Sequence, residues 1–395
     1  MRRGFLLILV IGLMYKGYKL YMEKLNDNKK VKVLEISHGL APGGIESFLI
    51  NVFENIDRNK VEISFALACE GKQFYEDKVI SEGAKVYHTS DLNGTKNIVK
   101  HFFRLIKVLR KEGPFDVVHT NIDFFNGVNL LAAFIAGVPV RISHSHNTNS
   151  AHARTVGANL PIRIYRKVMR TIINALSTKR LGCSKYANLY MYGDKVKDTI
   201  VINNGVDFNK FKVTEEIIGL NINQNKINFI TVGRMCEQKN SLFIVKVINE
   251  LVKLNNKFHL YWIGKGPQED EIKSLIKRYK LENNITLLGS RKDVPNIMTK
   301  MDFMLFPSKW EGLPVTLVEA QVANLPCFIS DKITDEADLG LCNVISLEKD
   351  EIQWATTINS YIKSSNYNQK LLEDKISSFN IKNVVKDIEK IYLQA

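Results

Sequence analysis

The hydrophobic positions of the chain fall into short runs that alternate between two spacings. Continuous apolar runs rich in Val, Ile and Phe predict buried strands, and apolar residues spaced three and four apart predict helices with one buried face. This alternation predicts a parallel sheet with right-handed crossovers. In the first half of the chain, strands are expected at 31–37, 61–68, 85–88, 116–121 and 139–146, and helices at 48–56, 74–82, 97–111 and 125–136.

A second alternating series begins after a polar, asparagine-rich stretch at 208–225, which we interpret as a linker. Two α/β domains in series, each doubly wound and Rossmann-like, would face each other across a cleft. The expected strands of the second series are 226–232, 258–263, 285–288, 303–306 and 326–330. The predicted parts are an N-terminal extension at 1–30, a first domain at 31–208, a second domain at 209–378 and a C-terminal helix at 379–395.

Length and composition agree with this division. The chain has 395 residues, of which 45% are hydrophobic and 24% are charged, as in globular proteins with two ordinary cores. The net charge of +14 favours an acidic partner, which could be a nucleic acid, an anionic lipid or a phosphorylated substrate. The five cysteines form no Cys-x-x-Cys pair, so neither a zinc site nor a disulfide framework is expected.

The N-terminal extension combines basic and apolar residues. Arg2 and Arg3 precede an apolar run at 4–15, whose ~18 Å helical length is short of the ~30 Å hydrocarbon core. Lysines follow it, so we interpret the extension as an interfacial membrane anchor. The alternative is that translation starts at Met22. A cytoplasmic protein, located at the inner face of the cell membrane, is the expectation.

A basic segment within 151–180 carries seven cations and no acid. Apolar residues interleave with these cations at helical spacing, which predicts a basic amphipathic helix at 161–180 that could lie on an anionic membrane surface. The alternative is a solvated basic face over a core stripe. No nucleic-acid-binding motif accompanies the charge, so a nucleic acid is not expected as partner.

Two acids lie close together after the strand at 303–306. Glu311 is on a loop marked by Gly and Pro, and Glu319 lies eight residues later in a helix that begins near Pro314. Two cations, Arg234 and Lys239, follow the first strand of the same predicted domain, so all four side chains are expected at one edge of the sheet. Cations that bind a diphosphate and carboxylates that bind sugar hydroxyls would suit a nucleotide sugar. No Asp-x-Asp motif stands at a strand end, so no metal or other cofactor is predicted.

The first predicted domain adds a glycine turn and histidines at strand ends. Gly43 and Gly44 lie between a strand and a helix, where backbone N–H groups can contact a phosphate. His119, His144 and His146 are candidates for proton transfer or oxyanion contact. The alternative for His119 and His144 is that they are ordinary loop histidines.

In these segments the chain resembles the retaining glycosyltransferases of family 4, which have the GT-B fold. The resemblance covers residue 31 to the C-terminus, and a bacterial subgroup that builds exopolysaccharide or capsule is more similar still. The motifs are Gly-Gly-Ile-Glu46, His-Ser-His-Asn-Thr148, Asn-Gly-Val-Asp207, Gly-Arg-x4-Lys239, Gly-x-Gly-Pro267 and Glu311-x7-Glu319. Ile45 and Asn324 depart from the common pattern, which has alanine and glycine there.

The resemblance implies a role for each site residue. Gly44 would lie near the donor phosphate and His146 near the reacting sugar, and the last helix would return to the first domain. The anomeric configuration would be retained, with the leaving phosphate deprotonating the acceptor. In the second domain, Arg234 and Lys239 would bind the diphosphate, Glu311 the transferred sugar, Glu319 the ribose, and the backbone from Arg291 to Val294 the base.

The sequence therefore predicts a metal-independent, retaining hexosyltransferase. Its donor would be a UDP-sugar, and its acceptor a glycan or a lipid-linked sugar in exopolysaccharide or capsule synthesis. The alternative is a catalytically silent, membrane-associated scaffold of a polysaccharide assembly complex.

Overall fold

The computed structural model describes residues 30–41, 43–147, 160–211, 217, 219–364 and 370–394. It divides into two compact units. Unit 1 comprises residues 1–205 and 382–395, and unit 2 comprises 206–381. Of the N-terminal extension predicted at 1–30 as a membrane anchor, residues 1–29 lie outside the described residues. Within the described part of the chain, no helix has both the length and the apolarity needed to cross a membrane.

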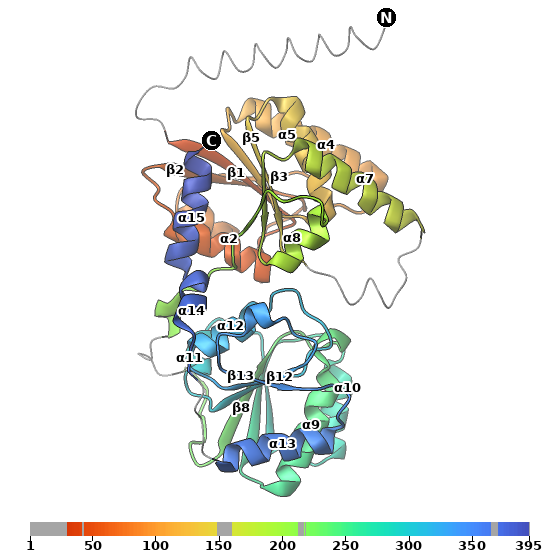
Figure 1. Ribbon diagram of the computed structural model, residues 1–395, viewed down its shortest axis with the longest axis vertical. Helices are drawn as coiled ribbons and strands as arrows, with labels where there is room; N and C mark the ends of the chain where they lie inside the picture. Colours follow the sequence, from red (N-terminus) through yellow and green to blue (C-terminus); the bar gives the residue numbers. More distant parts are fainter. Residues whose placement is uncertain are drawn as a thin grey trace, which may run out of the picture. The chain divides into compact units, whose positions relative to one another are not determined.

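Unit 1 is built on a seven-stranded sheet in which all neighbouring strands are parallel (Figure 1). The strand order is β3-β2-β1-β4-β5-β6-β7. Strands of such a sheet are buried on both faces, which explains their continuous apolar runs. The strands are β1 (Val31–Ser37), β2 (Val61–Leu67), β3 (Val86–His88), β4 (Val117–Thr120), β5 (Val140–Ser145), β6 (Lys179–Gly182) and β7 (Thr199–Val201).

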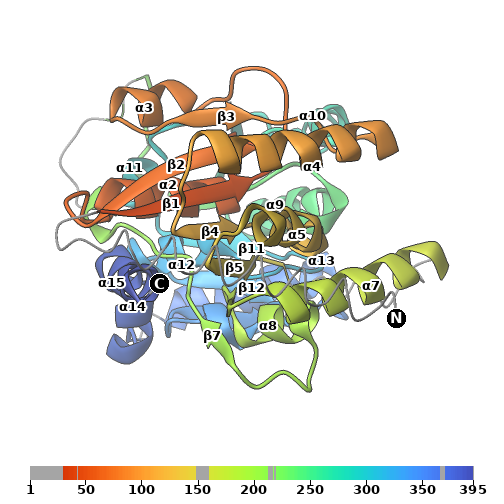
Figure 2. The ribbon, with the colours of Figure 1, turned by 90° about the horizontal axis from the view of Figure 1, so that it is seen from above.

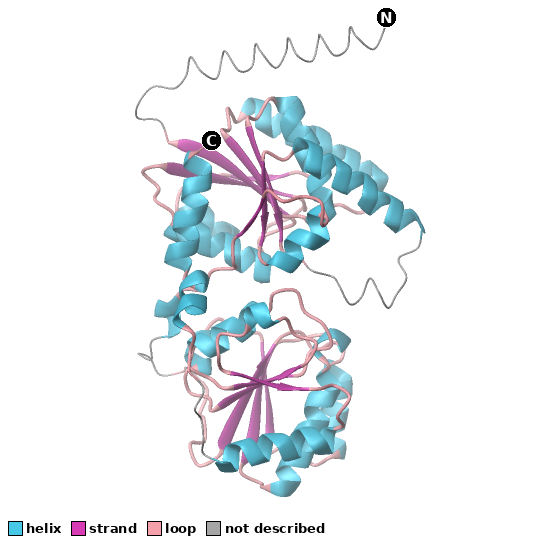
Figure 3. Ribbon diagram, in the orientation of Figure 1, coloured by secondary structure: helices cyan, strands magenta, loops and turns pink. Residues whose placement is uncertain are grey.

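Helices cover both faces of this sheet (Figures 2 and 3). On one face, α4 and α5 pack with Leu34, Ile36 and Val118 in a single apolar core cluster. On the other face, Phe53 of α2 contacts Phe65 of β2, and Tyr392 of α15 reaches β1 and β4. The predicted return of the last helix to the first domain is thereby confirmed. The helices are α2 (Gly44–Asn55), α3 (Glu76–Ser81), α4 (Gly94–Lys111), α5 (Asn126–Ala136), α7 (Leu160–Leu176), α8 (Lys185–Tyr192) and α15 (Ile381–Leu393).

Unit 2 repeats this architecture with a six-stranded parallel sheet of order β10-β9-β8-β11-β12-β13. Its core joins α9 and α13 to the sheet, and Trp262 and Trp354 are fully buried in it. The strands are β8 (Ile227–Val232), β9 (Phe258–Ile263), β10 (Ile285–Gly289), β11 (Phe303–Phe306), β12 (Cys327–Ser330) and β13 (Cys342–Ile345). The helices are α9 (Ser241–Leu254), α10 (Glu269–Arg278), α11 (Val294–Met298), α12 (Val315–Val322), α13 (Glu351–Ser364) and α14 (Glu373–Phe379). The α/β prediction with two doubly wound sheets is confirmed.

The predicted helix at 161–180 is too long at its C-terminal end. α7 ends at Leu176, and Lys179 and Arg180 belong to β6, where Lys179 pairs with Ile142 of β5. Since β6 has only four residues and two of them are cations, no apolar run marks it in the sequence. Arg180 donates a hydrogen bond to Asp198 at 2.5 Å instead of contributing to a basic helical face.

Candidate functional site

Three loops of unit 2 meet at the carboxyl edge of its sheet, one after each of β8, β9 and β10. Gly233 N donates to Ile263 O at 2.9 Å, and Gly264 N donates to Gly289 O at 2.8 Å. A Cβ on Gly264 would lie 2.0 Å from the Gly233 oxygen, and its φ of +135° also favours glycine. The glycines of these motifs therefore allow the loops to pack backbone against backbone.

An ion pair at this edge joins two of the residues that were predicted to bind the nucleotide sugar. Lys239 ends the short 3-10 helix Glu237–Lys239, and Glu311 lies in the loop after β11. Lys239 Nζ is 2.7 Å from Glu311 Oε1, with side chains that are 19% and 8% exposed. The ammonium also lies 4.6 Å from the centre of the Phe306 ring. Because both charges are largely withdrawn from water, each depends on the other.

Gln238 supports the loop that carries Glu311. Its carbonyl accepts a hydrogen bond from Lys309 N at 2.8 Å, and its Nε2 donates to Trp310 O at 3.2 Å and to Glu311 Oε2 at 3.3 Å. Arg234, in the loop after β8, is exposed to solvent. Its guanidinium could therefore bind an anion without any rearrangement of buried side chains.

Glu319 lies in the second turn of α12 and is partly buried. Burial raises the pKa of this carboxyl to about 7, against a smaller opposing effect of Lys210. The helix begins at Val315 with Pro314 as its N-cap, which agrees with the predicted start near Pro314. A carboxyl that is poorly compensated in the protein is suited to hydrogen bonds from ligand hydroxyls.

The segment from Arg291 to Val294 is closed by a two-pronged ion pair. Arg291 Nε and Nη2 lie 2.8 and 2.5 Å from the two carboxylate oxygens of Asp293, which is the N-cap of α11. These hydrogen bonds raise the pKa of Arg291 and lower that of Asp293. The pair gives the loop a defined shape, and the role in binding a base stays a prediction.

The two predicted phosphate-binding glycines of unit 1 differ in their surroundings. Gly43 is the N-cap of α2, and a Cβ there would lie 2.3 Å from Glu46 Oε2. A Cβ on Gly44 would meet nothing within 4 Å. Gly43 therefore makes room for the protein's own carboxyl, whereas Gly44 borders open space beside the start of a helix, where an anion can bind.

His146 follows β5 directly and is held between two asparagines. Its Nε2 is 2.9 Å from Asn121 Oδ1, and its Nδ1 is 3.3 Å from Asn204 Oδ1. The ring also packs beside Phe48 of α2, with a centroid distance of 5.4 Å. Burial, followed by the nearby His119, lowers the pKa of His146 to about 3. The ring is consequently a poor proton acceptor near neutral pH.

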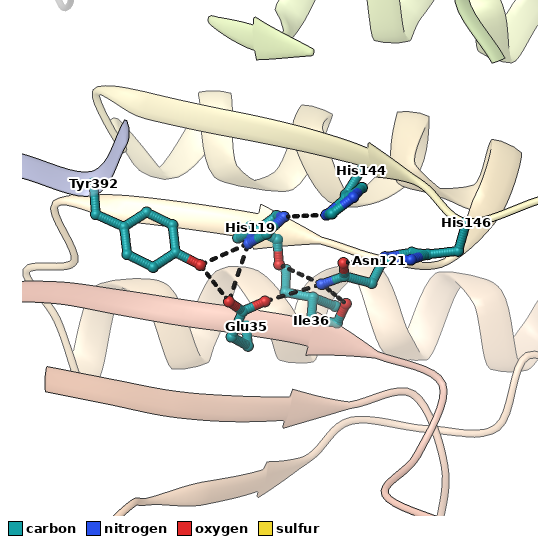
Figure 4. Close-up of polar contacts among 7 residues, drawn as sticks. All are labelled: Glu35, Ile36, His119, Asn121, His144, His146 and Tyr392. Carbon is teal, nitrogen blue, oxygen red and sulfur yellow. Dashed lines mark hydrogen bonds and ion pairs between the residues drawn. The ribbon is translucent and has the colours of Figure 1, made fainter. Parts of the chain in front are cut away.

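His119 and His144 lie in strands β4 and β5 inside unit 1, so they are neither placed for the proton transfer or oxyanion contact considered for them nor loop histidines, which was the alternative (Figure 4). Both are fully buried, and their parallel rings stack with centroids 5.2 Å apart. His119 Nδ1 is 3.0 Å from Glu35 Oε1 and 2.7 Å from the Tyr392 hydroxyl. Burial lowers the pKa of His144 well below its usual value. Their position in strand interiors, facing α2 and α15, accounts for the difference.

Three residues of this interior network were missed by the sequence analysis: Glu35, Asn121 and Tyr392. Glu35 is an acid flanked by Leu34 and Ile36 in a mostly apolar strand, and this was a usable signal because a buried charge requires partners. Tyr392 is far from Glu35 along the chain, so no local sequence pattern could indicate that the two side chains are in contact.

Two family models match consecutive parts of the chain. The model described as Glycosyltransferase Family 4 matches residues 42–210, and the model described as Glycosyl transferases group 1 matches 212–377. EpsF of Bacillus subtilis, named as a glycosyltransferase, is 31% identical over 344 residues, which are 85% of this chain and 88% of EpsF. The chain belongs to the family 4 glycosyltransferases.

Two further relatives of this glycosyltransferase have more specific names. CapH of Staphylococcus aureus, a capsular polysaccharide biosynthesis glycosyltransferase, is 28% identical across 92% of this chain and 99% of its own. An Escherichia coli enzyme is named UDP-Gal:alpha-D-GlcNAc-diphosphoundecaprenol alpha-1,3-galactosyltransferase. It is 27% identical across 77% of this chain and 80% of its own.

The fold of this glycosyltransferase matches solved structures of GT-B proteins. HepE of Anabaena, crystallised with UDP and glucose, superposes with a TM-score of 0.73 over 92% of this chain and all of that one, at 18% identity. At this identity the likeness concerns the fold alone. In the part of the chain that the structure describes, no three His, Cys, Asp or Glu side chains gather as metal ligands. Metal independence stays a prediction.

Proposed function

We propose that this glycosyltransferase transfers a hexose from a UDP-sugar to a glycan or lipid-linked acceptor, with retention and without a metal, in exopolysaccharide or capsule synthesis. The names of CapH and of the Escherichia coli galactosyltransferase support the biosynthetic setting and the class of donor and acceptor. The observation that carries the proposal is the Lys239–Glu311 ion pair at the carboxyl edge of unit 2, with Glu319 on the helix that follows Glu311.

The ion pair suggests how charge changes when the donor binds. A diphosphate would compete with Glu311 for the Lys239 ammonium, and the exposed Arg234 would add a planar fork for phosphate oxygens. Released from the lysine, the Glu311 carboxylate could accept hydrogen bonds from sugar hydroxyls. The two cations would then stabilise the charge that develops on the leaving diphosphate.

The chemical step replaces one bond at the anomeric carbon by another. The bond from this carbon to the diphosphate oxygen breaks, and the acceptor oxygen bonds to the carbon on the same face. The acceptor proton passes to an oxygen of the leaving phosphate. The low pKa of His146 agrees with this assignment, because the ring would not hold that proton at neutral pH. His146 would instead contact a sugar hydroxyl.

The test is sugar-dependent UDP release by the full chain. Glu311→Gln and Lys239→Ala are each expected to lower the rate at least tenfold, because each removes a group that the donor would contact. Lys309→Ala is the matched control, since Lys309 forms an exposed ion pair with Glu237 at 3.2 Å in the same loops. Its rate should stay within about twofold of wild type.

Loss of one partner of a buried pair can also destabilise the fold, by about 3–5 kcal/mol when burial is complete. The double variant Lys239→Met/Glu311→Gln separates the two effects, because no charge is left uncompensated. We expect it to recover most of the lost stability and none of the lost rate. Wild-type rates in both single variants would exclude the proposed donor site.

A catalytically silent scaffold remains the second candidate function. It would bind neither UDP nor any nucleotide sugar, so all donor-site variants would behave alike. The presence of both cations and both carboxylates in one unit favours the enzyme, because a scaffold has no need of them.

Attachment to an anionic membrane surface is a further part of the proposal, and α7 of unit 1 supports it. Leu160, Ile164 and Val168 recur every four residues and are 67%, 53% and 47% exposed. Fewer cations than predicted remain beside them, because Arg166 and Arg170 stack on Phe124. The helix would therefore bind lipid mainly through its apolar stripe, with Arg163 and Lys167 as the adjoining cations.

A further inference from the structure

We propose that Glu35 and Asn121 are positioning residues that hold His146 in the tautomer protonated at Nε2, with Tyr392 of the last helix anchoring Glu35 (Figure 4). The inference deepens the proposed function and rests on it, since it concerns the histidine assigned to the sugar.

The orientation of the Asn121 amide follows from its neighbours. Its Nδ2 lies 2.9 Å from Glu35 Oε2, 3.5 Å from Ile36 O and 3.4 Å from His119 O. All three atoms are hydrogen-bond acceptors, so the NH2 group of the amide must face them. The amide oxygen then faces His146 Nε2 at 2.9 Å.

This orientation determines the proton on His146. An amide oxygen can only accept, so Nε2 of His146 must carry the hydrogen. With its pKa lowered to about 3, the ring is neutral at pH 7, and Nδ1 is left with a lone pair. Nδ1 faces the amide oxygen of Asn204, Oδ1, at 3.3 Å. Since neither atom can donate in this tautomer, the contact is not a hydrogen bond unless the Asn204 amide turns, and a sugar hydroxyl could replace it by donating to Nδ1.

Glu35 is itself held by donors on both sides. The Tyr392 hydroxyl donates to Oε1 at 2.5 Å, and His119 Nδ1 lies 3.0 Å from the same oxygen. The register pairs Glu35 directly with His119 across β1 and β4. Asn121 lies two residues beyond His119, on the same face of the sheet, so its amide reaches Oε2 of the same carboxylate.

Stability alone is a weak explanation for this arrangement. Glu35 is 2% exposed, and a buried polar cluster is often no more stable than an apolar one of the same volume. What an apolar core could not supply is a fixed acceptor beside His146. If the ring carried its proton on Nδ1 instead, that atom would donate where the sugar hydroxyl is expected to donate.

The test combines NMR spectra of the 15N-labelled histidine rings with steady-state kinetics of the full chain. We expect wild-type His146 to be protonated at Nε2. In Glu35→Gln the new amide can either donate or accept, so Asn121 loses its shortest fixed acceptor and keeps only the longer contacts to Ile36 O and His119 O, at 3.5 and 3.4 Å. We therefore expect His146 to populate both tautomers, and kcat to fall about tenfold with KM for the UDP-sugar changed less than threefold. Tyr392→Phe leaves Asn121 its acceptor, so it should keep the tautomer and lose less rate.

Asn129→Ala is the matched control. Asn129 Oδ1 lies 2.8 Å from His101 Nε2 in a second buried Asn–His pair of unit 1. This variant should lower the melting temperature without changing the His146 signals or kcat of the folded fraction. Protonation of wild-type His146 at Nδ1, or an unchanged tautomer and kcat in folded Glu35→Gln, would overturn the proposal. The spectra need no substrate, so absence of transferase activity would count against the proposed function alone.

Discussion

The candidate site in unit 2 is distinguished by charged side chains that are largely shielded from water, where a charge is unfavourable. Lys239 and Glu311 are mostly withdrawn from water, and the carboxyl of Glu319 has a raised pKa. Functional sites often contain such groups, because their charge is kept for a ligand instead of being satisfied by the fold. For Glu319, both the loss of stability and the gain in ligand binding can be measured.

We expect Glu319→Gln to remove a pH dependence of stability. Between pH 4.5 and about 7 the folded state keeps a proton that the unfolded state has released, so stability falls as pH rises and levels off above about 7. The glutamine variant should be more stable than wild type by about 1–3 kcal/mol at pH 8, with no such advantage at pH 4. Urea unfolding of both proteins at several pH values is the measurement.

The same substitution should weaken UDP binding at least tenfold at pH 8, although it makes the protein more stable. If the free energy of unfolding changed equally with pH in the two proteins, folding would not raise the pKa of Glu319. An unchanged UDP affinity would remove its assignment to the ribose.

At the scale of residues, sequence motifs could identify candidate site residues that are separated by a few positions in the sequence. The connections that follow strands of unit 2 contain Arg234, Lys239 and Glu311. The alternation of strands and helices was enough to predict that these connections lie at one edge of the sheet. Motifs could not find Glu35 or Tyr392, because their contact joins residues 357 positions apart and depends on the register of β1 and β4. They also could not tell that His119 points into the interior.

At the scale of elements, α7 shows how tertiary contacts change the meaning of a pattern. Its sequence is basic and amphipathic, yet Arg170 donates to the backbone oxygens of Met191 and Tyr190. Cations that stabilise the fold are not available to lipid headgroups. The short strands β6 and β13 were missed because polar residues interrupt them: β6 begins with Lys179 and Arg180, and β13 contains Asn343.

We expect Ile164→Asp to reduce binding to anionic vesicles about tenfold, because the substitution puts a charge into the exposed apolar stripe of α7. Co-sedimentation with anionic and with zwitterionic vesicles is the measurement. Ile352→Asp is the matched control, since Ile352 is a similarly exposed isoleucine on α13 of unit 2. Equal binding by both variants and wild type would exclude α7 as the membrane contact.

At the scale of the whole molecule, the alternation of strands and helices was enough to predict two parallel sheets, because the central strands are buried and the helices between strands have an apolar face. The order of the strands and the partner of the last helix were not contained in that alternation. α15 joins unit 1 through long-range contacts, such as the Lys60–Glu389 ion pair and the Tyr392 hydrogen bonds.

The central claim is that unit 2 binds a nucleoside diphosphate sugar through Lys239 and Glu319. Thermal unfolding of the full chain with a panel of UDP-, GDP- and TDP-sugars tests it most directly. A ligand present at 100 times its dissociation constant adds about 2.7 kcal/mol of stability. We predict stabilisation by at least one UDP-sugar and its loss in Lys239→Ala and in Glu319→Gln. No stabilisation by any sugar of the panel, or equal stabilisation of wild type and both variants, would contradict it.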